Sequence, residues 1–327
     1  MKRSSLIFLI LFLTFVVTHP LAAAERKTAQ ANGIVLAMFG TTVEPALQSL
    51  LNIREAVEKA YPETPVRMAF TSNIIRGIWQ ERSVDQAYRQ LHPQIPEDIF
   101  QIQGPLATIA GLQDQGIDSI IVQSTHIAPA EEFLDLCSYV EGLVSIKTIK
   151  ARHKPFQHLV VGRPALGTFG TTHSYAKDVR QAAKALIADA ELARKEEAAL
   201  VYMGHGNDHF PSGGPYLEFA ARMRELYPDV LTLIGTVEGF PGLEDVRSQL
   251  QQAGVNRVLL KPFMVVAGDH VMNDMAGPGE GSWLSVLKKE GFEVIPVSKG
   301  LGEDPAFVQI YVSHIAETAR DAEISLR

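Results

Sequence analysis

The chain alternates short apolar runs with segments of helical periodicity, and this alternation restricts its fold more than any other feature. In the first half, the apolar runs that end in glycine or polar turns are Gly33–Phe39, Val66–Thr71, Ser119–Gln123 and His158–Val161. In the second half they are Ala198–Met203, Leu231–Gly235, Arg257–Pro262 and Glu293–Val297. Helical segments separate them, among them Pro45–Tyr61, Tyr175–Glu197 and Asp304–Arg320. Strands that alternate with helices predict an α/β fold with parallel sheets flanked by helices.

The two halves also align with each other at the ends of their predicted strands. FGTT at 39–42 matches MGHG at 203–206, AFTS at 69–72 matches GTVE at 235–238, and QSTHIAPAEE at 123–132 matches KPFMVVAGDH at 261–270. These matches set Thr41 opposite His205, Ser72 opposite Glu238, and Glu132 opposite His270. We therefore expect two similar Rossmann-like domains that face each other across a cleft, with Glu132 and His270 on opposite walls.

The N-terminus has the order of a secretory signal. Lys2 and Arg3 precede an apolar run over Leu6–Val17, and three alanines at 22–24 supply a cleavage site. The run is too short to span a membrane comfortably, and no cysteine follows the cleavage point to carry a lipid anchor. We expect a signal peptide at 1–24 cleaved after Ala24, a leader at 25–32, an N-terminal domain at 33–173, a C-terminal domain at 174–327, and a periplasmic location.

Composition narrows the partners. The net charge is −7, and removal of Lys2 and Arg3 would bring it to about −9, so neither nucleic acid nor an anionic membrane is an expected partner. Cys137 is the only cysteine, which excludes an internal disulfide and a metal site of several thiolates. Any metal would therefore be bound by histidine and carboxylate. A homo-oligomer is expected, since dimers are the commonest state.

Polar groups gather at three strand ends of the second half. VVAGDHVMNDMAG at 265–277 follows the Arg257–Pro262 strand and contains His270, while His205 and Glu238 follow earlier strands, 33 and 32 residues apart. Neighbouring parallel strands end at one edge of a sheet, so these side chains can meet. Two imidazoles and a carboxylate suit Co²⁺, Ni²⁺, Fe²⁺ or Zn²⁺, and three ligands leave coordination positions open.

Each residue also has a simpler interpretation. A single loop histidine is more often a surface or hydrogen-bonding residue than a ligand, and Glu238 alone is more often solvated. Asp269, Asn273 and Asp274 are interpreted as turn, capping or ligand-supporting residues. His126 and His209 lie near the predicted site by sequence and are reserve candidates. The histidines without such context are assigned to the surface or to packing: His92, His153, His158, His173 and His314.

The motifs together resemble a known family. MGHG at 203–206, GTVEG at 235–239 and the GDH-x-x-NDMAG pattern, with FGTT and QSTHIAPAEEF in the first half, are similar to those of the CbiK-type anaerobic sirohydrochlorin cobaltochelatases. The resemblance runs from Gly33 to the C-terminus. These are ATP-independent class II chelatases, related in fold to the protoporphyrin ferrochelatases. The resemblance implies two facing α/β domains and insertion of Co²⁺, as substrate, into sirohydrochlorin with release of two protons.

The resemblance also implies roles for the candidate residues. His205 and His270 would bind the metal with Glu238 as a further ligand, and Glu132 would act from the opposite wall. An imidazole can accept a pyrrole proton near neutral pH, and His205 is our choice for that role. Thr41, Ser72, Asp269, Asn273 and Asp274 would contact the substrate or support the ligands.

The chain departs from the compact cytoplasmic pattern of this family in three ways. It has extra residues around 87–100 and 147–155, and it carries the export signal, away from cytoplasmic cobalamin synthesis. Leu134 rather than a histidine follows Phe133, so bound haem is not predicted. Two alternatives stay open: a chelatase that uses Fe²⁺ or Ni²⁺, and a periplasmic metal, tetrapyrrole or haem carrier without turnover.

Overall fold

The computed structural model describes residues 32–170, 172–208 and 213–327. The predicted signal peptide at 1–24, all but the last residue of the predicted leader at 25–32, and the reserve candidate His209 lie outside the described residues.

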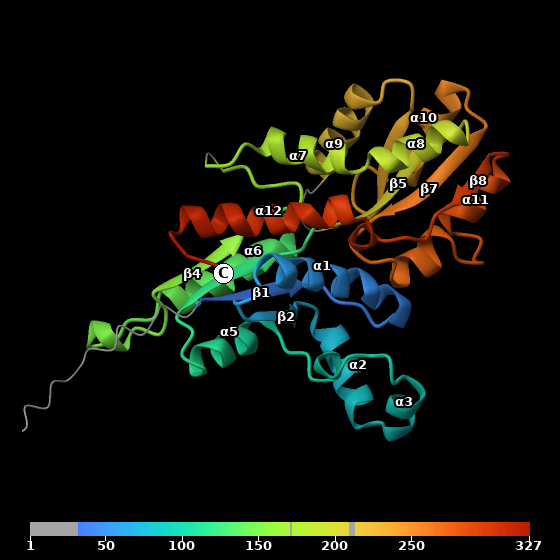
Figure 1. The fold of residues 1–327 in the computed structure, drawn as a ribbon. Helices are drawn as coiled ribbons and strands as arrows, with labels where there is room; N and C mark the ends of the chain where they lie inside the picture. Colours follow the sequence, from blue (N-terminus) through green and yellow to red (C-terminus); the bar gives the residue numbers. More distant parts are fainter. Residues whose placement is uncertain (1–31, 171, 209–212) are drawn as a thin grey trace, which may run out of the picture.

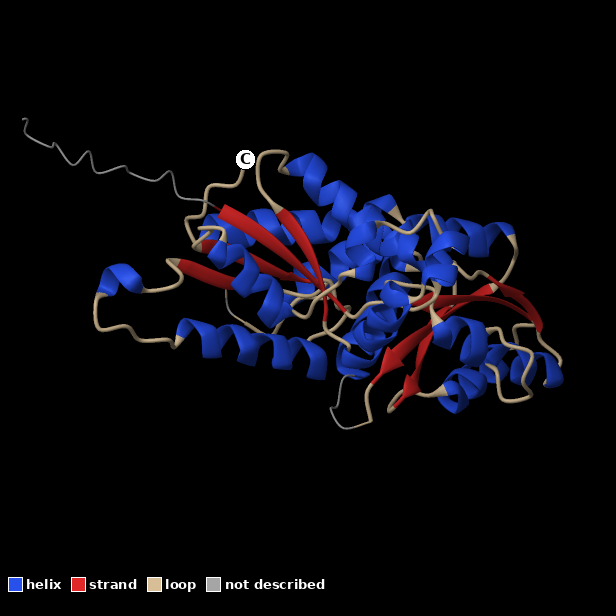
Figure 2. Cartoon of the chain, turned by 90° about the horizontal axis from the view of Figure 1, so that it is seen from below, coloured by secondary structure: helices blue, strands red, loops and turns tan. Residues whose placement is uncertain are grey.

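The structure contains two four-stranded parallel sheets with the same strand order, which confirms the predicted fold class (Figures 1 and 2). The first has the order β2-β1-β3-β4 and consists of β1 (Asn32–Met38), β2 (Val66–Phe70), β3 (Ser119–Ser124) and β4 (His158–Gly162). The second has the order β6-β5-β7-β8 and consists of β5 (Ala199–Gly206), β6 (Thr232–Glu238), β7 (Arg257–Phe263) and β8 (Glu293–Pro296). The sequence matches between the halves thus pair β1 with β5, β2 with β6 and β3 with β7.

Helices cover both faces of the first sheet, as right-handed parallel crossovers require. One face carries α1 (Leu47–Ala60), and the other carries α5 (Pro105–Asp114) and α6 (Glu131–Val144). Three further helices, α2 (Asn73–Val84), α3 (Gln86–Leu91) and α4 (Glu97–Phe100), form a projection beyond β2 (Figure 1). Short 3₁₀ turns lie at Glu44–Ala46 and Ala151–His153. The extra residues at 87–100 therefore belong to this projection.

The second sheet is covered in the same way. The helices after β4 that belong to this half are α7 (Tyr175–Ala185), α8 (Ile187–Lys195), α9 (Gly213–Leu226), α10 (Leu243–Ala253) and α11 (Trp283–Lys289). A π-helical turn lies at Val271–Met275 and a 3₁₀ turn at Leu301–Glu303, and the last helix, α12 (Pro305–Asp321), packs on the first sheet. The single helix expected over Tyr175–Glu197 is wrong. It divides at Leu186, whose backbone leaves the helical region (φ −95°, ψ 27°) while its side chain stays fully buried.

The last helix joins the two halves. Asp304 caps α12 by accepting hydrogen bonds from the Ala306 and Phe307 amides, and α12 then runs back over the first sheet. It packs on β3, β4, α1 and α7, and it lies between the two lobes (Figure 1). Core residues from both sheets, among them Leu36 and Tyr202, therefore belong to one continuous hydrophobic cluster. The halves share a core although the sequence suggests two separate units.

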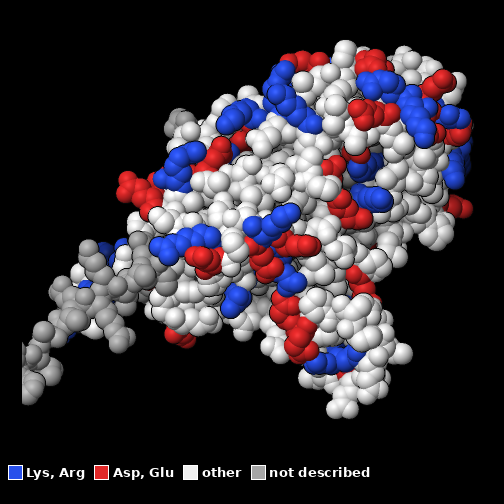
Figure 3. All heavy atoms as spheres, viewed as in Figure 1, with Lys and Arg blue, Asp and Glu red and all other residues white. Residues whose placement is uncertain are grey.

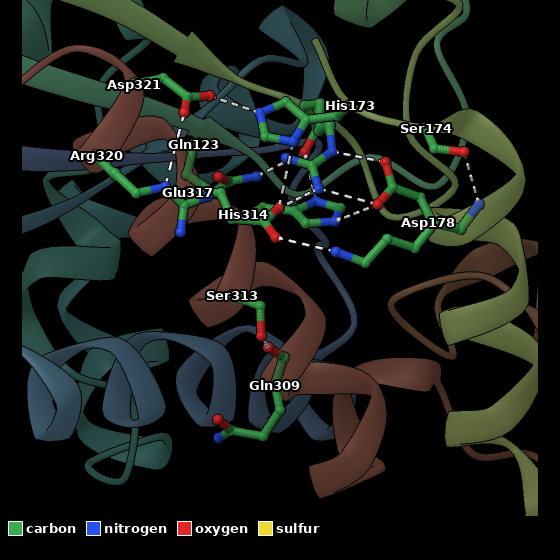
Figure 4. A network of polar contacts seen from close by, with 12 residues as sticks. Gln123, His173, Ser174, Asp178, Gln309, Ser313, His314, Glu317, Arg320 and Asp321 are labelled. Carbon is green, nitrogen blue, oxygen red and sulfur yellow. Dashed lines mark hydrogen bonds and ion pairs between the residues drawn. The ribbon is translucent and has the colours of Figure 1, made fainter.

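A buried charge network secures the same joint (Figure 4). Arg163, just after β4, donates through Nε and Nη2 to the Asp178 carboxylate on α7, at 2.6 and 2.9 Å, and also pairs with Glu317 on α12. His314, fully buried on α12, lies 3.6 Å from the same Asp178 carboxylate. Burial alone would raise the pKa of Asp178, but the nearby His314 imidazole and the hydrogen bonds from Arg163 outweigh it and hold the pKa well below its usual range.

On the face shown in Figure 3, basic and acidic side chains are interspersed over both lobes. Among the described helices, none has the length and apolar character needed to cross a bilayer.

Candidate functional site

The carboxyl ends of both sheets open into one cavity of about 450 Å³. Its walls include residues that follow β1, β3, β5 and β7, so strands from both halves contribute. Most of the lining is apolar. The polar and titratable side chains among the lining residues are Thr41, Thr42, Thr125, His126, Glu132, His205, Tyr216, Asp269 and His270. A largely apolar cavity with a few convergent polar groups is typical of a small-molecule site.

His205 and His270 form the centre of one wall. His205 ends the central strand β5, and His270 follows the neighbouring strand β7. Their rings lie edge to face with centroids 4.7 Å apart and an interplanar angle of 84°. Both side chains are about one-third exposed. The pairing predicted from the strand ends is thus present in the structure.

Each ring has a hydrogen-bond partner at Nδ1, and none is present at Nε2 among the residues that the structure describes. Nδ1 of His205 is 3.0 Å from the Gly206 carbonyl oxygen, and Nδ1 of His270 is 2.6 Å from Oδ2 of Asp274. A carbonyl or a carboxylate only accepts, so in this arrangement each Nδ1 carries the proton and donates. The lone pair of each ring is then at Nε2, the tautomer that a divalent metal requires.

Glu238 lies close to this pair but not within bonding distance. It ends β6 beside Gly206, and its Oε2 is 3.9 Å from Nδ1 of His205. Gly206 has φ +78°, and a Cβ there would lie 1.8 Å from the Glu238 carbonyl oxygen, so glycine is required for the two strand ends to approach. In the described ranges, no group of three or more His, Cys, Asp or Glu side chains is arranged to hold a metal ion. The three-ligand assignment stays a prediction.

The neighbours of His270 support its position. Asp274, one turn further along, accepts the hydrogen bond from its imidazole, and Asn273 donates through Nδ2 to Oδ1 of Asp269 at 2.9 Å. Asp269 lines the cavity, whereas Asn273 and Asp274 lie behind it.

The opposite wall comes from the first half of the chain. Glu132 lies in the first turn of α6 after β3 and lines the cavity, as His270 does from the other half. Its neighbour Glu131 accepts a 2.9 Å hydrogen bond from Nδ2 of Asn207, which lies beyond His205, and this contact crosses the cleft. The two walls are therefore in direct contact at one edge.

Thr41 and Ser72 differ in their surroundings. Thr41 lines the cavity, and its carbonyl oxygen accepts a 2.8 Å hydrogen bond from Nε1 of Trp79. Arg82 donates to the next carbonyl, that of Thr42, at 2.8 Å. Ser72 caps α2, since its hydroxyl accepts from the Ile75 amide, and it is not among the cavity-lining residues.

Two cavity residues extend the set predicted from sequence. His126, a reserve candidate, has Nδ1 2.8 Å from the Ser124 hydroxyl, and burial lowers its pKa to about 4. Tyr216 on α9 was not singled out, because a tyrosine on an amphipathic helix has the pattern of a core residue. The sequence marks His126 as a reserve candidate, since it lies just beyond β3, but no sequence signal marks Tyr216.

The fold and the cleft define a bilobed α/β protein with a histidine pair at the carboxyl ends of one of two equivalent sheets. Residues 32–320 match the cobalt chelatase (CbiK) family, and the chain belongs to that family. It is 34% identical over 283 residues to the sirohydrochlorin cobaltochelatase CbiKC of Nitratidesulfovibrio vulgaris, covering 86% of this chain and 89% of the relative. It is 26% identical over 284 residues to the sirohydrochlorin cobaltochelatase of Salmonella typhimurium, covering 86% and 94%.

Solved structures share the fold. SirB from Bacillus subtilis with Fe³⁺ superposes with a TM-score of 0.58 at 14% identity, covering 90% of this chain and 98% of the other. The sirohydrochlorin chelatase SirB from Bacillus subtilis subspecies spizizenii in complex with cobalt gives 0.55 with the same coverage and identity.

Proposed function

We propose that this chain inserts Co²⁺ into sirohydrochlorin without ATP and releases two pyrrole protons. The observation that carries the proposal is the His205–His270 pair, whose free Nε2 atoms adjoin a largely apolar cavity in a member of the cobalt chelatase family. An apolar cavity suits a flat macrocycle, and neutral imidazoles suit a borderline divalent ion.

In this proposal, Nε2 of His205 and Nε2 of His270 bind the incoming ion, and Glu238 supplies a carboxylate oxygen. Two N–H bonds of the macrocycle break as its four ring nitrogens bind Co²⁺ in place of the protein ligands, so two protons must leave. As the ion passes to the pyrrole nitrogens, Nε2 of His205 regains its lone pair and accepts one proton. Glu132, which lines the cavity from the other wall, takes the second proton in this proposal.

The test follows metal insertion by the change in tetrapyrrole absorbance, with Co²⁺, Fe²⁺ and Ni²⁺ in parallel. We expect Co²⁺ to be inserted fastest, and His205→Ala to lower the rate by a factor of about 10² or more. His158→Ala, at the start of β4, is the matched control. Tight binding of tetrapyrrole or metal without faster insertion would replace this proposal with a carrier function. Unimpaired insertion by His205→Ala would remove the proposed role of that residue.

We also propose that the protein is exported to the periplasm. The support is the order of Lys2 and Arg3, the apolar run Leu6–Val17 and the three alanines at 22–24. Fractionation of cells that express the full chain, with N-terminal sequencing, should find a periplasmic protein that begins at Glu25. A cytoplasmic protein that retains Lys2 would contradict the proposal.

A further inference from the structure

Tyr216 occupies an unusual place beside the histidine wall. It lies in the first turn of α9, is 5% exposed and lines the cavity. Its ring packs edge to face on Phe263, with centroids 6.0 Å apart and an angle of 75°. A Cβ on Gly204 would lie 2.9 Å from the same ring, so the tyrosine lies directly against the backbone that precedes His205. Only glycine at 204 permits this approach without a shift.

The phenol oxygen of Tyr216 reaches the other side of His205. This oxygen accepts a hydrogen bond from the Gly206 backbone. Tyr216 therefore contacts Gly204 and Gly206, the two residues that flank His205. Burial raises the pKa of Tyr216 to about 12, with the Gly206 bond opposing and the Glu132 charge adding to the rise. The hydroxyl therefore keeps its proton, and Glu132 is near enough to act on it electrostatically.

Tyr216 and Glu132 line the same cavity from the two halves of the chain. The oxygen of Tyr216 accepts from the Gly206 amide, which leaves its own O–H free to donate. The Glu132 carboxylate, from the other half of the chain, is an acceptor in the same cavity. A hydrogen bond to a charged group is stronger than a neutral one and orients it.

We propose that Tyr216 is a positioning residue for metal insertion: its ring fixes the backbone around His205, and its hydroxyl orients the Glu132 carboxylate. The inference rests on the proposed function, because it assigns Tyr216 a part in that reaction. It makes two separable claims, one for the ring and one for the hydroxyl.

A double-mutant cycle tests the hydroxyl. Tyr216→Phe keeps the ring, and we expect kcat for insertion to fall roughly 10-fold or more while the KM for Co²⁺ is unchanged. In the Glu132→Gln background the same change should have no further effect, because Tyr216 acts through the carboxylate. Tyr227→Phe is the matched control and should behave as wild type. Tyr227 directly follows the C-terminal end of α9, and its hydroxyl donates to the Ala183 carbonyl oxygen.

The ring is tested by Tyr216→Leu, with Co²⁺ affinity measured by titration in the absence of tetrapyrrole. We expect weaker Co²⁺ binding than in Tyr216→Phe, because the backbone around His205 loses its support. Thermal unfolding and circular dichroism establish that each variant is folded. The hydroxyl claim would be overturned if Tyr216→Phe lowered kcat equally in the wild-type and Glu132→Gln backgrounds, or did not lower it at all. Equal Co²⁺ affinities for Tyr216→Leu and Tyr216→Phe would overturn the ring claim. Absence of insertion by the wild type would instead overturn the proposed function, and this inference with it.

Discussion

Oδ2 of Asp274 lies 2.6 Å from Nδ1 of His270, one helical turn earlier in the chain. The carboxylate fixes both the rotation of the imidazole and its tautomer, and it leaves Nε2 directed away from the hydrogen bond. His205 reaches the same state differently, through the carbonyl of its own neighbour Gly206. A backbone carbonyl thus sets the orientation and tautomer of His205, whereas a side chain, that of Asp274, sets those of His270. Only the second of these groups can be removed by a substitution.

Asp274→Asn should therefore weaken Co²⁺ binding by a factor of roughly 10–100, because partners of this kind have that effect on metal sites. Titration of the metal-free protein with Co²⁺, followed by its absorption bands, measures the change. Asp321→Asn is the matched control, since Asp321 bonds His173 at the same 2.6 Å at a different place, beside α12. Equal affinities for the wild type and Asp274→Asn would show that His270 is not a ligand.

Glu132→Ala should lower the insertion rate by about 10² or more, because removal of a positioned proton acceptor has effects of that size. The rate is measured at saturating Co²⁺ and tetrapyrrole, so that binding does not limit it. Glu141→Ala, on the same helix but outside the cavity lining, serves as control. An unchanged rate in Glu132→Ala would exclude Glu132 from the reaction.

Gly206→Ala should destabilise the protein by more than about 1 kcal/mol and weaken Co²⁺ binding. The residue has φ +78°, and its added Cβ would meet the Glu238 carbonyl oxygen at 1.8 Å. Gly254→Ala separates the effect of backbone strain from that of the clash with Glu238, because Gly254 has a similar φ of +67° but no atom near the added carbon. Urea unfolding should show a larger loss for Gly206→Ala, and only that variant should lose metal affinity. Equal losses in both would mean that backbone strain alone matters.

Asp178→Ala should cost about 3–5 kcal/mol of unfolding free energy, because it leaves Arg163 buried without its main partner. Asp229→Ala removes the partner of Arg194 in a surface ion pair and should leave the urea midpoint nearly unchanged. A loss as small in Asp178→Ala as in the control would show that the network does not secure the joint between the halves.

His126 should make stability depend on pH in the acid range. Burial lowers its pKa to about 4, below its ordinary value of about 6.5. Between these two pH values, His126 is protonated in the unfolded chain and neutral in the folded chain. The stabilisation is complete above pH 6.5 and is lost as the pH falls towards 4. Urea midpoints of the metal-free protein measured from pH 7.5 to 4 should therefore fall more steeply in the wild type than in His126→Gln. Identical pH dependence would contradict the assignment.

The strands and the likeness of the halves could be read from the sequence, because both are local properties. Apolar runs ending in glycine or polar turns predicted the eight strands of the described residues, and the three aligned motifs predicted two similar domains, which the structure shows to share one strand order. The meeting of His205 and His270 followed as well, since adjacent parallel strands end at one edge. The break at Leu186 was missed because the residues on either side keep helical periodicity, and only packing makes that leucine end the helix.

What tertiary structure alone decided lies in contacts between distant segments. Helix α12 is amphipathic in sequence, but periodicity cannot say which sheet will receive its apolar face, and it packs on the first. The same holds for Tyr216: its sequence pattern is that of a core residue, but in the fold it packs against Gly204 and lines the cavity that Glu132 also lines. The sequence determined the strand ends and the residue types placed there, because they depend on neighbouring residues. The folded chain determined which groups face each other across the cleft, because long-range packing sets those distances.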